Sequence, residues 1–323
     1  MPHETLINLT DGKWADNTLQ EIVAHFEAAF PSRVIGYYLE GSYADGTAIP
    51  TSDLDLIVVF DGEFAYGEDE AATALIRTLE EFSPIELDIE LIDEVTLREN
   101  ANPMFKLGSQ LVYGKDIRAS IPLMSIEQWA RQRMHAAYWL MINVFERPKP
   151  VHIPLEFPKP DAPFFGYINR PMRLTDGSEV MTTRNLIRVT GWIATARLAH
   201  EAREYVMRKR ECYPTYQRVI GDEWTPLLSQ IDQRVRTDWH YRIPESKVER
   251  QELCTLLEQT VAYENHFLGV YRQFVLGELN KSNHDARIEA INYLNGIPFS
   301  DPELEQALQT AKKLSEKGTS VSF

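Results

Sequence analysis

A cluster of prolines in the middle of the chain separates it into two parts. Residues 148–171 carry seven of the eighteen prolines. Proline lacks a backbone N–H and its ring clashes with the preceding helical turn, so no continuous helix can run through this segment. We therefore expect an extended connection here, and 323 residues are enough to place a domain on either side of it.

The part before the prolines alternates helical and strand patterns. Apolar residues recur at helical spacing in some segments and at every second position in others. The expected helices are 16–30 and 68–82, and the expected strands are 34–40, 54–60, 85–92 and 110–114. This order predicts a small mixed β-sheet with flanking helices, which we place at residues 1–122.

The remainder of the chain has mainly helical patterns. The expected helices are 125–146, 184–207, 222–235, 246–279 and 301–316. We predict that residues 123–323 form an all-α helical bundle with the proline-rich connection at 148–171. The expected fold class is therefore α+β, with a mixed-sheet domain followed by a helical one.

Acidic residues are concentrated at the start of the chain. Residues 1–100 contain 22 acidic and 4 basic residues, whereas the remaining 223 are nearly balanced. Such a segment repels phosphates, so we expect no sequence-independent binding along a nucleic-acid backbone. It could instead hold a divalent metal and attract a cationic substrate. A solvated surface that keeps the protein soluble explains the same charge.

The chain has no sign of membrane insertion or export. No apolar run reaches the roughly 18 to 20 residues of a membrane helix, and the first fifteen residues lack the basic and apolar regions of a signal peptide. The two cysteines, Cys212 and Cys254, are too few for a disulfide framework and lack zinc-site spacing. We expect a cytoplasmic protein without membrane association, and the sequence does not indicate its oligomeric state.

A glycine and a serine follow the first expected strand. Gly41 and Ser42 directly follow the run VIGYYLE, and the small-residue stretch after them leads to the next strand. A tight turn of this kind presents backbone N–H groups at the start of a helix, where they bind anionic oxygens. The pair therefore predicts a phosphate-binding turn.

Acidic residues recur at every second position in the next two strands. Asp53 and Asp55 flank Leu54, and the run from Glu86 through Asp88 to Glu90 repeats the spacing. Side chains two residues apart on a strand share a face.

Carboxylates on one face repel each other unless a cation lies between them, and hard oxygen ligands favour Mg²⁺. Acids from adjacent strands beside a phosphate-binding turn suit phosphoryl transfer. The alternative is a sheet with an acidic outer face beside an ordinary loop.

These residues resemble the nucleotidyltransferases of the DNA polymerase beta superfamily. The signature of that family is a Gly-Ser turn, an Asp-x-Asp strand and a further carboxylate on the following strand, which Gly41-Ser42, Asp53, Asp55 and Asp88 match. The resemblance implies that the three aspartates are catalytic and bind Mg²⁺, and that the turn binds the nucleotide.

The resemblance implies transfer of a nucleoside monophosphate, with AMP from ATP as the first choice among nucleoside triphosphates, to an acceptor group. For the third strand, Asp88 is our choice of metal ligand. Glu86 and Glu90 are competing candidates for the base that takes the acceptor's proton.

The second part is similar to the C-terminal domain of streptomycin and spectinomycin adenylyltransferases. The similarity consists of Arg184-Asn185 opening an apolar helix, Lys209 near the expected end of that helix, and a following Tyr-Pro segment. It implies that Arg184 and Lys209 reach the triphosphate and that the acceptor is a small molecule resembling an aminoglycoside. The basic run at 208–210 could equally be a solvated helix end.

The sequence departs from those enzymes in two respects. Thr182-Thr183 stand where an acidic residue usually precedes the Arg-Asn pair, and the linker and the C-terminal helices are longer. Two other functions therefore stay open. One is nucleotidyl transfer to a protein or RNA acceptor, and the other is a non-catalytic nucleotide-binding regulatory role.

Overall fold

The structure is a computed structural model that describes residues 5–10, 12–99, 102–173, 178–281, 284–294 and 301–318. It consists of two compact units. The first contains the chain up to Gln132 and, much later in sequence, Arg197–Thr225. The second contains Arg133–Arg173, Glu179–Ala196 and the chain from Pro226 onward. The domain boundary at residue 122 stays a prediction.

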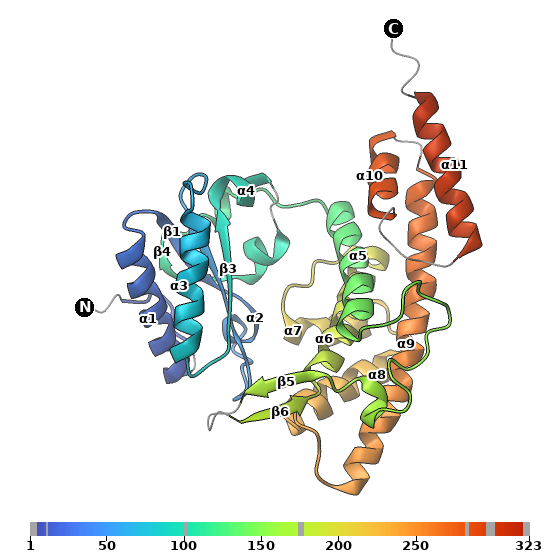
Figure 1. Cartoon of the computed structure of the whole chain (residues 1–323), viewed down its shortest axis with the longest axis horizontal. Helices are drawn as coiled ribbons and strands as arrows, with labels where there is room; N and C mark the ends of the chain where they lie inside the picture. The colour runs from blue at the N-terminus through green and yellow to red at the C-terminus, as the bar shows by residue number, and fades with distance from the viewer. Residues whose placement is uncertain are drawn as a thin grey trace. The chain divides into compact units, whose positions relative to one another are not determined.

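The first unit is built on a four-stranded mixed sheet in the order β3-β2-β1-β4 (Figure 1). Its elements are α1 (Lys13–Ala29), β1 (Val34–Leu39), α2 (Gly41–Ala44), β2 (Leu54–Phe60), α3 (Glu68–Phe82), β3 (Leu87–Asp93), α4 (Glu94–Glu99) and β4 (Gln110–Gly114). β1 pairs antiparallel with β2 and β4, whereas β2 and β3 are parallel and joined through α3. The predicted mixed sheet with flanking helices is confirmed.

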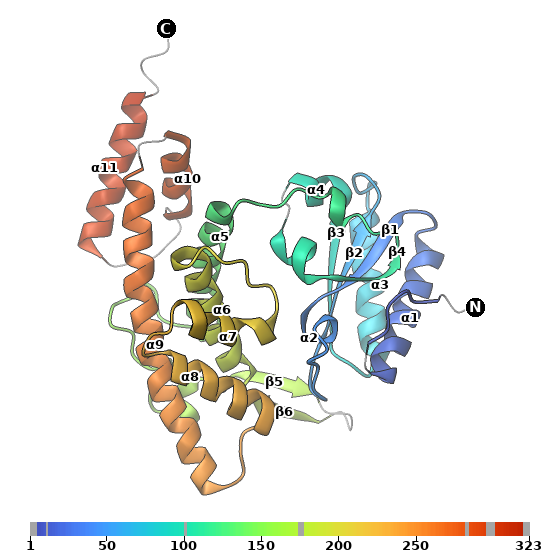
Figure 2. The ribbon, with the colours of Figure 1, turned by 180° about the vertical axis from the view of Figure 1, so that it is seen from behind.

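The two faces of the sheet bury different sets of apolar side chains. α1 and α3 cover one face, where Leu54, Leu56 and Val58 join the core (Figures 1 and 2). The alternate residues Ile57 and Val59 belong to a separate cluster on the other face. This alternation fixes which residues of β2 and β3 face away from α1 and α3, since one step of register would exchange the two sets.

A segment from the second half of the chain completes the first unit. α6 (Arg184–Glu201) ends earlier than the predicted 184–207, because Arg203 has a left-handed backbone with φ of 61°. A left-handed residue cannot continue a right-handed helix. The chain then runs extended to α7 (Lys209–Val219). Lys209 therefore starts a helix, and the prediction that it lies near the end of one is wrong.

The second unit is mainly helical. It contains most of α5 (Ile126–Val144), most of α6, α8 (Thr225–Gln230), a π-helical turn (Ile231–Asp238), α9 (Lys247–Leu279), α10 (His284–Leu294) and α11 (Pro302–Gly318). Figures 1 and 2 show α10 and α11 beside the C-terminal end of α9, and an ion pair from Arg272 of α9 to Asp301 joins them. A short hairpin of β5 (Arg170–Arg173) and β6 (Glu179–Thr182) adds a strand pair that an all-α prediction does not include.

The proline-rich segment belongs to the second unit, and it contains bends, turns and a 3₁₀ turn at Pro163–Gly166 before β5 begins. Its role as a connection between domains stays a prediction. A buried ion pair between Arg147, which directly precedes the segment, and Glu264 of α9 holds its start. The hydroxyl of Tyr167 donates to the same carboxylate at 2.5 Å, and Arg147 also donates to the carbonyl of Glu156 at 2.6 Å. In the described part of the chain, no helix is long and apolar enough to cross a membrane.

Candidate active site

The predicted Gly-Ser turn lies at the end of β1 and begins α2. Gly41 has φ of 62°, a backbone conformation that favours glycine. A Cβ at this position would lie 2.8 Å from Cγ of Asp55 and closer still to its Oδ2. The N–H of Glu40 also donates to the carbonyl of Asp55 at 2.9 Å. Only a residue without a side chain brings the turn this close to an acid of β2.

Two polar groups at this turn are buried without a hydrogen-bond partner among the described residues. They are Oγ of Ser42, whose residue is 2% exposed, and Oε1 of Glu40. Buried polar atoms in folded proteins are almost always satisfied, so two unsatisfied atoms on neighbouring residues call for an explanation. A ligand at the turn could supply the missing partners.

The sheet register brings two of the three predicted aspartates together. Asp55 and Asp88 are direct partners across the parallel pair β2 and β3. Paired residues of adjacent strands share a face. Glu90, two positions along β3, shares that face. This is the face away from α1 and α3.

Asp53 and Glu86 lie just outside their strands. β2 begins at Leu54, whose N–H donates to the carbonyl of Glu86 at 2.8 Å. Burial raises the pKa of Tyr43, and the negative charge of Asp53 nearby raises it further. Asp53 therefore borders α2.

The acidic face contains a fourth carboxylate that the sequence analysis missed. The pKa of Glu40 is raised to about 8, chiefly by burial and then by the negative charges of Glu90, Asp55 and Asp88 in that order of size. Desolvation and then Asp88 raise the pKa of Glu90 as well. Strand alternation could have found Glu40, because it continues the face of Tyr38 one step beyond the end of β1.

The chemistry of these groups fits Mg²⁺. All the ligands they offer are carboxylate oxygens, burial and then the neighbouring carboxylates raise the pKa of Glu40 and of Glu90, and one buried oxygen of Glu40 lacks a partner among the described residues. Across the described ranges, no three His, Cys, Asp or Glu side chains converge closely enough to hold an ion as they stand. The assignment of Asp53, Asp55 and Asp88 as metal ligands stays a prediction.

Lys209 lies in the same unit as the turn. Its backbone N–H is close enough to Asp45, the residue that ends α2, to lower the pKa of that carboxyl against the larger effect of burial, which raises it. The neighbouring Arg210 donates to the carbonyl of Asp45 at 2.9 Å. The start of α7 thus lies against the residue that follows the Gly-Ser turn and its short helix.

Arg184 has a different environment, in the second unit. It is 6% exposed and lies over the ring of Tyr241, 5.7 Å from the ring centre. The adjacent Asn185 donates to the side chain of Asn169 at 2.8 Å. The triphosphate-binding role of Arg184 stays a prediction.

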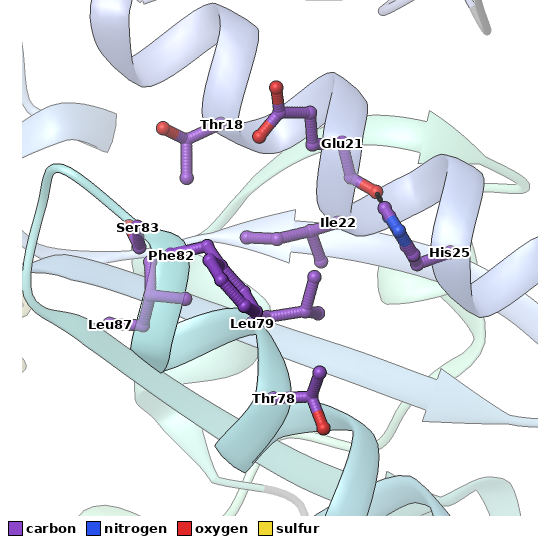
Figure 3. A pocket seen from close by; sticks show the side chains of 9 residues that line it. All are labelled: Thr18, Glu21, Ile22, His25, Thr78, Leu79, Phe82, Ser83 and Leu87. Atoms are coloured by element: carbon purple, nitrogen blue, oxygen red, sulfur yellow. Dashed lines mark hydrogen bonds between the residues drawn. The ribbon is translucent and has the colours of Figure 1, made fainter.

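A hollow of about 340 Å³ lies between α1 and α3. Figure 3 shows Ile22 and His25 of α1 opposite Leu79 and Phe82 of α3, with Leu87 of β3 at its floor. These side chains belong to the helix-covered face of the sheet, opposite Asp55 and Asp88. The hollow is therefore separate from the acidic site.

Part of the chain is similar to known proteins. A family model described as a nucleotidyltransferase domain matches residues 19–117. A solved structure from Sulfolobus solfataricus, provisionally assigned as a nucleotidyltransferase, is 21% identical, and the match covers 33% of this chain and 94% of that one with a TM-score of 0.24.

A second solved structure is similar over more of the chain. The spectinomycin adenyltransferase AAD(9) from Enterococcus faecialis, crystallised with ATP and spectinomycin, is 12% identical, and the match covers 77% of this chain and 98% of that one with a TM-score of 0.44. No curated protein matches the chain.

Proposed function

We propose that this chain, whose residues 19–117 match a family model described as a nucleotidyltransferase domain, transfers a nucleoside monophosphate to a hydroxyl of a small-molecule acceptor. The observation that carries the proposal is the contact between Gly41 and Asp55, with Asp88 paired beside it. This arrangement puts a phosphate-binding turn against two carboxylates on one sheet face.

Each part of the site has a proposed task. Asp53, Asp55 and Asp88 would hold Mg²⁺, which when bound neutralises the phosphates and stabilises the developing charge. The N–H groups at Gly41 and Ser42 would bind the β- and γ-phosphates, because backbone N–H groups at the start of a helix can donate to anionic oxygens. Lys209 would offset the charge of the departing pyrophosphate.

The reaction is an in-line displacement at the α-phosphorus. The acceptor oxygen forms a bond to phosphorus while the bond to the oxygen bridging to the β-phosphate breaks, and pyrophosphate leaves with that electron pair. The acceptor's proton passes to a carboxylate of the acidic face. Glu90 is our choice for this base, because it lies within β3 on the same face as Asp88, whereas Glu86 precedes the strand.

ATP and a cationic acceptor are the proposed substrates. ATP is the donor that the family resemblance implies. The 22 acidic against 4 basic residues in the first hundred favour an acceptor with several amino groups, such as an aminoglycoside-like compound. A cytoplasmic location suits both, since ATP is supplied there.

The test is pyrophosphate release from Mg-ATP with a panel of polyamino sugars, and detection by mass spectrometry of a product heavier by one AMP. The wild type should release pyrophosphate only with an acceptor, and Asp55→Asn should lower kcat by at least about 100-fold. Asp69→Asn, the same substitution at an exposed acid of α3, is the matched control and should be fully active.

Other outcomes separate the remaining functions. If a protein or an RNA is labelled and no small molecule is modified, the acceptor is a macromolecule and the proposed small-molecule acceptor is wrong. Nucleotide binding without pyrophosphate release from any of the four ribonucleoside triphosphates would contradict the proposal and favour a regulatory role.

A further inference from the structure

The segment between α6 and α7, residues 202–208, is fastened along the first unit at several points. The hydroxyl of Tyr205 donates to the carbonyl of Met124 at 2.6 Å. Met207 packs closely on Gly108, since a Cβ added to Gly108 would lie 3.1 Å from the Cβ of Met207. The segment therefore delivers the start of α7 to a defined place.

That place is Asp45. Nε of Arg208 lies 3.5 Å from its Oδ1, Arg210 donates to its carbonyl at 2.9 Å, and the backbone N–H of Lys209 between them is close enough to lower the pKa of its carboxyl. Three consecutive residues from 163 to 165 positions away thus meet one residue. Asp45 in turn donates its own N–H to the carbonyl of Gly41 at 3.1 Å, so the contact is linked directly to the turn.

Asp45 is unusual for a residue that only ties two segments together. It is 4% exposed, and one of its carboxylate oxygens has no hydrogen-bond partner among the described residues. Burial raises its pKa against the opposing effect of Arg208 and Arg210. Burying a carboxylate without full compensation costs stability, so packing alone does not account for it.

The result of the contact is a concentration of positive charge beside the turn. α7 is an 11-residue helix whose first turn carries the positive end of the helix dipole. Lys209 and Arg210 are exposed there, while the carboxylate of Asp45 forms its ion pair with Arg208. The buried, unpartnered Oγ of Ser42 lies three residues before Asp45.

We propose that Asp45 is a positioning residue that fixes the basic start of α7 beside the Gly41-Ser42 turn, so that Lys209 and Arg210 meet the polyphosphate of the nucleotide. The inference rests on the proposed function and assigns a part of the chain outside residues 19–117 to nucleotide binding. Asp45 itself touches no nucleotide. It acts through the helix that it holds.

The experiment is calorimetric titration of the full chain with two probes, inorganic tripolyphosphate and adenosine. Asp45→Ala should weaken tripolyphosphate binding about tenfold, which corresponds to about 1.4 kcal/mol, and leave adenosine binding unchanged. Asp45→Asn should lie between Asp45→Ala and the wild type, because its amide oxygen can still contact the guanidinium of Arg208. In turnover assays, Asp45→Ala should raise KM for Mg-ATP more than it lowers kcat.

Two further variants separate positioning from simple destabilisation. Arg218→Ala removes the same charge from the other end of α7, where its partner is Glu204, and should leave both probes unchanged. Lys209→Ala should weaken tripolyphosphate binding in the wild type and have little additional effect in the Asp45→Ala background. Additive effects in this cycle would contradict the proposal.

The proposal is also wrong if Asp45→Ala binds tripolyphosphate as the wild type does, or if it weakens both probes equally. If Asp45→Ala does not fold, Asp45→Asn and Arg210→Ala carry the same test. Failure of the proposed function is distinguishable, because tripolyphosphate binding that depends on Asp45 can be measured without any transfer. Transfer with a KM that is independent of Asp45 would overturn the positioning role alone.

Discussion

Replacing Gly41 by alanine should damage both stability and activity through one contact. The substitution places a methyl group at a residue with φ of 62°, 2.8 Å from Cγ of Asp55. Either the turn or the Asp55 side chain must move. Gly62 provides a matched control, because it has nearly the same φ of 63° and nothing within 4 Å of the position its Cβ would take.

The expected losses follow from these geometries. The left-handed conformation costs an alanine about 1 to 2 kcal/mol at either position. At Gly41 the displaced Asp55 adds about 0.5 to 1.5 kcal/mol for leaving its preferred rotamer. We expect Gly41→Ala to lower the free energy of unfolding by about 1.5 to 3.5 kcal/mol and Gly62→Ala by about 1 to 2 kcal/mol.

Urea denaturation measures both losses, and pyrophosphate release measures function. The double variant Gly41→Ala/Asp55→Ala should regain the part of the stability that the clash removed, since the obstructing carboxylate is gone, but it should stay inactive. Equal destabilisation by Gly41→Ala and Gly62→Ala would refute the contact. So would a Gly41→Ala protein that keeps full activity.

Three further predictions concern charged groups. The pKa of Glu40 is raised from 4.5 to about 8 in the folded protein. Between these pH values the folded protein keeps the proton of Glu40 and the unfolded chain loses it, so the free energy of unfolding should fall as pH rises from about 4.5 to 8. Glu40→Gln should remove part of that fall and be more stable than the wild type by about 1 kcal/mol or more at pH 8.5, as measured by urea denaturation without metal; an unchanged pH profile would contradict the raised pKa. Arg147→Ala should cost about 3 to 5 kcal/mol, because it leaves the carboxylate of Glu264 buried and unpaired, whereas a loss below about 1 kcal/mol in chemical denaturation would show that the pair contributes little. Arg33→Ala should cost about 1 kcal/mol near neutral pH, and the loss should shrink as pH falls through the lowered pKa of Glu68, its bidentate partner; thermal unfolding at several pH values tests this.

Much of the first unit was predictable because local pattern and tertiary structure agree there. β2 and β4 begin and end where the apolar patterns do, at 54–60 and 110–114. The parallel pairing of Asp55 with Asp88 follows from two strands of matching alternation joined by a helix. The predicted nucleotidyltransferase resemblance is confirmed for residues 19–117.

The parts that sequence patterns did not predict depend on tertiary contacts or on single backbone angles. The left-handed Arg203, which ends α6, has no signal in an otherwise helical pattern. The β5–β6 hairpin is short and follows the prolines. The contact of Asp45 with Arg210 joins residues 165 positions apart, and no local pattern encodes such a pairing.

That separation also sets the order in which the molecule can be made. A ribosome adding about 5 to 20 residues per second needs roughly 10 to 30 s to synthesise the stretch between the two partners. β2, β3 and β4 are made within this stretch, and after β4 ends at Gly114 the sheet and the Gly-Ser turn can form while the cationic start of α7 has yet to be made. The nascent chain therefore presents its acidic face before it has the groups that we propose complete the nucleotide site, and a chain cut short in the proline-rich segment would contain the family-matched residues without that completion.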